Sequence, residues 1–103
     1  MTVIAFLTVA PTREGSLSAD VAAAIEALDD YDVSYETNPM GTVIEADDID
    51  ELLAAVGAAH KAVEADRVGT FLKIDDKRTS DEPASSKVDS VARELGHDPK
   101  RER

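Results

Sequence analysis

The fold of this chain is decided by the stretch Tyr35-Glu36-Thr37-Asn38-Pro39-Met40-Gly41-Thr42-Val43-Ile44-Glu45. It contains two short extended runs, 33–37 and 42–45, which are interrupted by Asn38-Pro39 and Met40-Gly41. Asn and Pro favour turns, and Gly tolerates the positive φ that many tight turns require. The stretch therefore predicts two adjacent strands joined by a tight turn.

The other elements follow from β-branched runs and from the i, i+3, i+4 spacing of apolar residues. They are a strand over Thr2–Ala10, a helix from Ser18 (its N-cap) to Asp29 or Asp30, a helix capped by Asp47 or Asp48 and running to Ala65, a strand over Val68–Asp75, and a helix from Ser85 or Ser86 that stops at Gly96. This β-α-β-β-α-β order predicts an α+β, ferredoxin-like fold, with two helices on one face of a four-stranded antiparallel sheet and an added C-terminal helix. We expect residues 1–96 to form one domain and residues 97–103 to form a polar tail.

The first predicted strand is apolar on both of its faces. Val3, Ala5, Leu7 and Val9 alternate with a second set that includes Ile4 and Phe6. Two helices in so short a chain cover one face of a sheet, so the other face needs a cover. The alternatives are an unusual loop or, as we expect, a second subunit stacked on that face. We therefore predict a homo-oligomer, namely a tetramer built as a dimer of dimers.

The chain is strongly acidic, with 22 acidic and 11 basic residues and a formal net charge of −11. This balance argues against nucleic-acid binding and against docking on an anionic membrane. It fits either a cationic ligand or, as we favour, solvation in a high-salt (halophilic) cytoplasm. There is no Cys, so disulfides, zinc knuckles and thiol chemistry are excluded. No apolar run could span a membrane and no signal peptide is visible, so we predict a cytoplasmic protein.

Few residues suggest chemistry. His60 lies on or beside the apolar stripe of its helix, a stripe that also includes Leu53, and we interpret it as a half-buried packing residue rather than a catalytic base. The acidic cluster at 47–51 lacks the spacing of a calcium loop and is explained by helix capping. Asp75-Asp76 followed by Lys77-Arg78 could pair locally or across a subunit boundary. We predict no catalytic residue and no metal site.

Three segments of the chain resemble the small thiamine-binding proteins of the YkoF-like family. They are the motif Tyr-Glu-x-x-x-Met-Gly-Thr-x-Ile-Glu at 35–45, Asp66-Arg67-Val68 leading into 73–78, and Ser86-Lys87-Val88-Asp89-Ser90-Val91. The resemblance extends from Val3 to about Leu95 and agrees with the predicted fold. It implies non-catalytic binding of thiamine or of its hydroxymethylpyrimidine precursor, for carriage, buffering or sensing, with no further cofactor.

The chemistry of that implied ligand selects nine candidate site residues. Hydroxyls would bond the aminopyrimidine, apolar side chains would contact the flat rings, a glycine would allow close approach of the backbone, and carboxylates would lie near the cationic thiazolium. The hydroxyls are Thr8, Thr37 and Thr42, the ring contacts Tyr35, Met40 and Phe71, the glycine Gly41, and the carboxylates Glu45 and Asp75. The alternative is that the threonines fill strand positions and that Met40 packs in a turn. With four aromatic residues in all, a site shared between subunits is more natural than a stacking sandwich within one.

Two other functions fit the same fold. One is a structural or regulatory assembly domain that has no small ligand. The other is a hydrolase of the acylphosphatase type, in which Arg13 would bind phosphate, although the flanking glycines of a phosphate cradle are missing. Binding of thiamine or hydroxymethylpyrimidine remains the favoured prediction.

Overall fold

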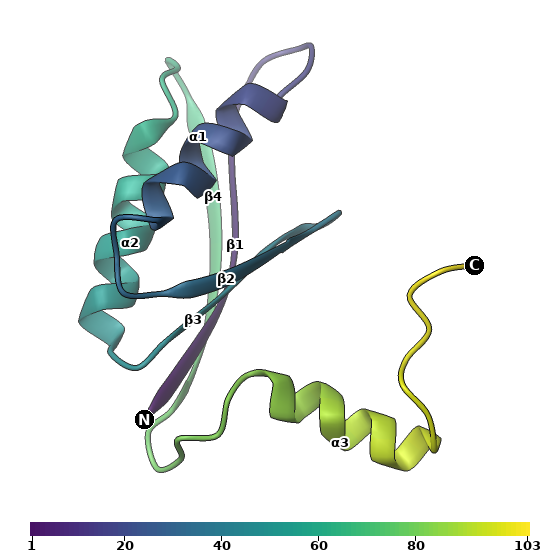
Figure 1. Ribbon diagram of the computed structural model, residues 1–103. Coiled ribbons are helices and arrows are strands. Elements are labelled where there is room, and N and C mark those ends of the chain that lie inside the picture. The colour runs from purple at the N-terminus through teal and green to yellow at the C-terminus, as the bar shows by residue number, and fades with distance from the viewer.

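The computed structural model describes residues 1–103 and has the predicted α+β architecture (Figure 1). Its elements are β1 (Thr2–Pro11), α1 (Ser18–Leu28), β2 (Ser34–Asn38), β3 (Gly41–Ala46), α2 (Ile49–Ala62), β4 (Val68–Lys77) and α3 (Ser85–Leu95). Every predicted strand and helix is present, and no boundary differs from the prediction by more than three residues. The ferredoxin-like arrangement is thus confirmed.

The four strands form one antiparallel sheet in the order β2-β3-β1-β4. Central β1 pairs with β4 along its whole length, from Thr2↔Lys77 to Pro11↔Val68. Its pairing with β3 ends at Leu7↔Thr42, because β3 starts at Gly41. Beyond Leu7, β1 therefore has a strand on its β4 side only.

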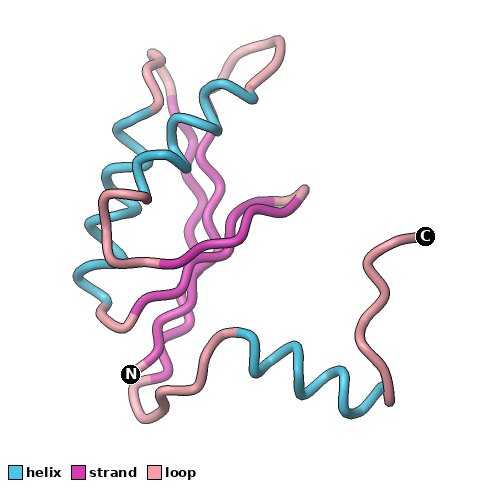
Figure 2. Tube along the Cα trace, in the orientation of Figure 1, coloured by secondary structure: helices cyan, strands magenta, loops and turns pink.

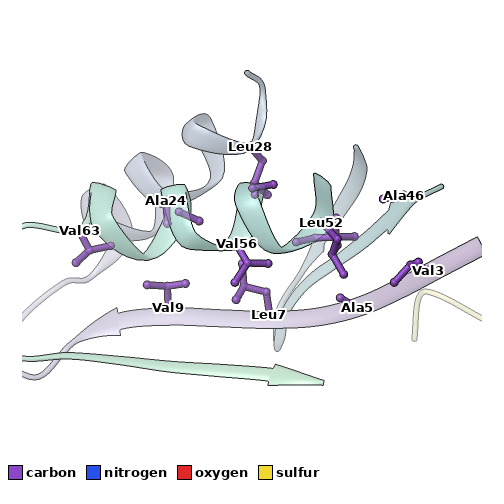
Figure 3. Close-up of a cluster of buried hydrophobic side chains, with 13 residues drawn as sticks. Val3, Ala5, Leu7, Val9, Ala24, Leu28, Ala46, Leu52, Val56 and Val63 are labelled. Atoms are coloured by element: carbon purple, nitrogen blue, oxygen red, sulfur yellow. The ribbon is translucent and has the colours of Figure 1, made fainter. Parts of the chain in front are cut away.

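The hydrophobic core lies between the sheet and the helices α1 and α2, which cover the same face (Figures 1 and 2). Figure 3 shows side chains from β1, β3 and both helices meeting in this layer. The alternation of β1 places Val3, Ala5, Leu7 and Val9 in the core, all at most 6% exposed. The burial of this face is the dominant source of stability for the fold.

The helix ends agree with most of the capping predictions. Asp48 is the N-cap of α2, and its carboxylate accepts a hydrogen bond from the Asp50 amide at 2.9 Å. Gly96 ends α3 in the left-handed region, with φ 80°. The predicted cap of α1 is wrong by one residue: Leu17 occupies the N-cap position without a side-chain bond, and Ser18 is already helical.

The turn between β2 and β3 uses its glycine differently from the prediction. The Asn38 side-chain oxygen accepts hydrogen bonds from the amides of Met40 (3.0 Å) and Gly41 (3.2 Å) and so closes the turn. Gly41 does not have a positive φ. A Cβ at this position would lie 2.5 Å from the ring of Phe6 and 2.9 Å from the methyl group of Thr8. Glycine is required because these two side chains pack over the backbone.

The sheet face opposite α1 and α2, here called the open face, is left without a cover. The Phe71 side chain is 59% exposed on this face, in register with Thr8 of β1. Helix α3 starts at the edge of the open face and then runs away from the sheet (Figures 1 and 2). No residue of α3 is buried. None of the three helices combines the length and apolar composition that crossing a bilayer requires.

Candidate ligand-binding site

A cavity of about 210 Å³ lies between α1, the end of β1 and the β2–β3 turn. Its walls are residues 7–10 of β1, Val21, Ala24, Ile25 and Leu28 of α1, and residues 37–42 around the turn. The cavity exists because β1 extends past the start of β3, so that the turn and α1 enclose the free side of β1. None of the lining residues is charged.

Two kinds of polar group face this apolar space. The hydroxyls of Thr37 and Thr42 lie opposite each other on β2 and β3, 3.1 Å apart, and Thr42 is only 5% exposed. The second kind is the backbone of residues 8–10, where β1 has no β3 partner and alternate amide and carbonyl groups remain free for a ligand. Hydroxyls and free strand backbone groups can both donate and accept, as recognition of a flat nitrogen heterocycle requires.

The structure brings together five of the nine predicted site residues. These five line the cavity: Thr8, Thr37, Met40, Gly41 and Thr42. Thr8 belongs to the wall although its side chain shares the open face with Phe71. Met40 is 80% exposed at the rim. The other four, Tyr35, Glu45, Phe71 and Asp75, do not line it.

Tyr35 connects two elements instead of contacting the cavity. Its hydroxyl donates a hydrogen bond of 2.6 Å to the carboxylate of Asp29, the residue that follows α1. This bond to a carboxylate raises the pKa of the Tyr35 phenol above its ordinary value, with smaller contributions from desolvation and from the charge of Asp29. Tyr35 thereby joins β2 to the end of α1.

The two carboxylates predicted to lie near a cationic ligand both hold α3. The Glu45 carboxylate accepts a hydrogen bond of 3.1 Å from the Ala84 amide, at the start of α3. Asp75 forms a 2.6 Å ion pair with Lys87 of α3, and this hydrogen bond and charge hold the pKa of Asp75 below its ordinary value. Both carboxylates lie on the open face, on the opposite side of the sheet from the hydroxyl pair.

Three further residues differ from their predicted surroundings or role. His60 is exposed rather than half-buried, and its ring bonds the Thr70 hydroxyl of β4. Leu53, assigned to the buried stripe of α2, is 46% exposed, because Ala55 takes the core-facing position. Arg13, the residue that an acylphosphatase site would use, forms an ion pair with Asp20.

The part of the site that the sequence analysis missed is the wall contributed by α1. Val21, Ala24, Ile25 and Leu28 have the apolar spacing from which the first helix was predicted, and that spacing indicates a core-facing stripe rather than a cavity wall. The small side chain of Ala24 in the middle of this stripe was the available signal, because a small residue facing a strand leaves space. The free backbone of β1 had no sequence signal, because strand register depends on long-range pairing.

Comparison with known proteins gives a consistent result. A family model described as thiamine-binding protein matches residues 5–92. A UPF0045 protein of Methanothermobacter thermautotrophicus is 51% identical over 98 residues, covering 90% of this chain and 99% of that protein. A UPF0045 protein of Bacillus subtilis is 35% identical over 101 residues, covering 89% of this chain and 96% of that protein.

Solved structures are similar over nearly the same length. A hypothetical protein of Methanocaldococcus jannaschii has a TM-score of 0.81 and 38% identity, covering 88% of this chain and 96% of that one. A Thermotoga maritima protein, named for a proposed role in thiamine biosynthesis or salvage, has a TM-score of 0.76 and 26% identity. The match covers 88% of this chain and 99% of the Thermotoga chain. The residues that the family model matches, 5–92, include every residue that lines the cavity.

Proposed function

The chain belongs to the thiamine-binding protein family, as its motifs predicted, and on this premise we propose that it binds thiamine or hydroxymethylpyrimidine without transforming it. The aminopyrimidine ring would occupy the cavity between α1, the end of β1 and the β2–β3 turn. The observation that carries the proposal is the Thr37–Thr42 hydroxyl pair beside the part of β1 that has no β3 partner, inside a largely apolar space without charged walls.

The size of the cavity favours one ring over two. Its volume of about 210 Å³ is below the roughly 300–1,000 Å³ of sites that enclose drug-sized ligands. Hydroxymethylpyrimidine is a single ring with small substituents, whereas thiamine adds a thiazolium ring. In thiamine, the second ring would lie outside the cavity, near the exposed side chain of Met40.

The polarity of the cavity supports the same orientation. A neutral aminopyrimidine can enter a space without charged walls and bond to hydroxyls and backbone groups, whereas a buried thiazolium cation would lack a counter-charge. At the rim, the cation would remain hydrated and close to a protein of net charge −11. Binding of this kind suits a carrier, buffer or sensor of the vitamin.

Isothermal titration calorimetry with hydroxymethylpyrimidine and thiamine tests the proposal. We expect one site per chain for each ligand and similar affinities, because the same ring is enclosed in both complexes. Thr42→Val should weaken binding of both ligands by roughly tenfold or more, since it removes a hydroxyl from a buried polar site. The matched control is Thr2→Val, which changes another buried sheet threonine at the opposite end of β1 from the cavity and should leave binding unchanged.

The result separates the proposal from its alternatives. Absence of heat with either ligand from a folded protein would refute the binding function and leave an assembly domain without a small ligand. Equal losses in Thr42→Val and Thr2→Val would refute the assigned location, because of these two residues only Thr42 lines the cavity.

A further inference from the structure

Two opposite walls of the cavity come from separate layers of the fold. Helix α1 supplies one of them, and the β2–β3 hairpin supplies the other. The tip of the hairpin, residues 38–41, extends beyond Leu7↔Thr42, the last pair that β3 makes with β1. Strand pairing with β1 therefore does not fix the distance between the hairpin tip and α1, and another contact must set it.

A single hydrogen bond joins these two walls. The Tyr35 hydroxyl on β2 donates it to the carboxylate of Asp29, the residue that follows α1, over 2.6 Å. No other hydrogen bond or ion pair connects α1 or Asp29 to β2 or β3. The connection between them is held separately, because the Asp32 amide donates a hydrogen bond of 2.9 Å to Glu51 of α2.

The strand register places the Tyr35–Asp29 bond directly beside the cavity. Tyr35 pairs with Ile44, which is fully buried beneath the helices, so both side chains start on the face that α1 and α2 cover. Residues two apart on a strand share a face, and Thr37, two residues further on, lines the cavity. At the other end of the bond, Asp29 directly follows Leu28, another lining residue. The bond thus runs from one wall to the other at the edge of the sheet that β2 forms.

This bond is better placed to hold local geometry than to stabilise the whole fold. The Tyr35 side chain is 38% exposed, so water competes for both partners and the net contribution to global stability is small. Neither Tyr35 nor Asp29 belongs to the buried core. A hydroxyl bonded to a carboxylate is nevertheless a short, directional contact. It fixes the spacing between the hairpin and α1, and with it the shape of the cavity.

We infer that Tyr35 is a positioning residue of the ligand site, because its bond to Asp29 holds the hairpin at the distance from α1 that the enclosed ring requires. The inference rests on the proposed function. Without the bond, the hairpin can move away from α1, and the Thr37–Thr42 pair moves with it. Part of the binding free energy is then used to restore the arrangement. Affinity falls although every lining residue is unchanged.

Isothermal titration calorimetry of the full chain with hydroxymethylpyrimidine, well below the melting temperature, tests this role. We expect Tyr35→Phe to raise the dissociation constant by roughly fivefold, on the scale of one hydrogen bond. Asp29→Ala should cause a similar loss, and the double variant should lose no more than either single variant, since both changes remove the same bond. Asp29→Asn should retain most of the affinity, because an amide oxygen also accepts a hydrogen bond from the Tyr35 hydroxyl.

Tyr31→Phe is the matched control. It makes the same chemical change within the connection between α1 and β2, at a tyrosine that packs against the hydrophobic core, and it should leave the affinity unchanged. Amide hydrogen exchange gives a readout that needs no ligand: exchange at residues 36–41 should be faster in Tyr35→Phe than in Tyr31→Phe or the unmodified chain. Circular dichroism should show that all variants are folded at the assay temperature.

The outcomes separate this inference from the proposed function. Binding by the unmodified chain with equal affinity in Tyr35→Phe would refute the role of Tyr35 and leave the proposed function standing. Absence of binding heat from the folded, unmodified chain would overturn both. An equal loss in Tyr31→Phe, or additive losses from Tyr35→Phe and Asp29→Ala, would assign the effect to something other than the bond and would also refute the inference.

Discussion

The substitution Gly41→Ala tests the packing at the centre of the motif that decides the fold. A Cβ at residue 41 would lie 2.5 Å from the Cζ atom of Phe6, 2.9 Å from its Cε1 and 2.9 Å from the Thr8 methyl carbon. All three distances are below the closest approach that real Cβ atoms show. The strain comes from side-chain packing, because the φ of Gly41 is not positive.

The expected loss of stability depends on how far the Phe6 ring must move to make room for the Cβ. Phe6 lies on central β1 between β3 and β4, in register with Val43 and Lys73, so its ring can move away from residue 41 only by giving up its contact with β3 on the open face. Insertion of a methyl group into such packing costs about 1–3 kcal/mol. A loss of 1 kcal/mol lowers the melting temperature of a domain of this size by about 4–8 °C.

Gly57→Ala is the matched control. A Cβ at residue 57 would have no neighbour within 4 Å, and Gly57 lies inside α2. Alanine at such a position should stabilise the protein by about 0.5–1 kcal/mol, because glycine loses more backbone entropy in a helix. The same substitution, glycine to alanine, should therefore lower the free energy of unfolding at residue 41 and raise it at residue 57.

Thermal and urea unfolding, followed by circular dichroism, measure both variants. If Gly41→Ala is as stable as the unmodified chain, the close approach of Phe6 and Thr8 to residue 41 is wrong. A double variant adds a second test: in a Phe6→Leu background, which removes the end of the ring, Gly41→Ala should cost less than it does alone. Equal costs in the two backgrounds would assign the strain to another neighbour.

Two further predictions concern ionisable groups. Asp29 raises the pKa of Tyr35 above 10.0, so the bond stabilises the fold below the ordinary phenol pKa, and this stabilisation is lost as the pH rises through the raised value. Ultraviolet titration should show one phenol that ionises late and that ionises at lower pH in Asp29→Asn. A titration that Asp29→Asn leaves unchanged would contradict the bond. Salt screens repulsion within a chain of net charge −11, so added potassium chloride should raise the melting temperature. A melting temperature that decreases from low salt to molar salt would contradict the idea that charge repulsion destabilises the fold.

The fold could be predicted because each of its elements is specified locally. The alternation of Val3, Ala5, Leu7 and Val9 with the other face of β1, the helical spacing around Leu28, and the Asn38-Pro39 turn each select one conformation. These signals agree with one another, and such consistency is what allows topology to be read from one sequence.

The candidate site could be predicted only in part, because it depends on the register of the strands and on the face of the sheet to which each side chain points. Thr37, Met40, Gly41 and Thr42 were predicted as a group and line one cavity in the structure, since a tight turn keeps neighbours in sequence close in space. Residues on different strands were assigned without knowledge of the face on which they lie. Phe71 consequently lies across the sheet from the Thr37–Thr42 pair, a placement that a shift of one residue in register would reverse.

The two carboxylates predicted to lie near the ligand are on the opposite face of the sheet from the cavity. Glu45 and Asp75 were expected to attract a cationic ligand, but both direct α3 away from the open face. The cavity on the helix side has no charged wall, so the binding energy of the proposed ligand would have to come from ring burial and hydroxyl bonds. If thiamine is the ligand, as proposed, the net charge of −11 would act on it only at long range, where it would raise the rate of encounter rather than the strength of contact. The proposed ligand site and the contacts that hold α3 therefore lie on opposite sides of the sheet, so a substitution in one need not disturb the other.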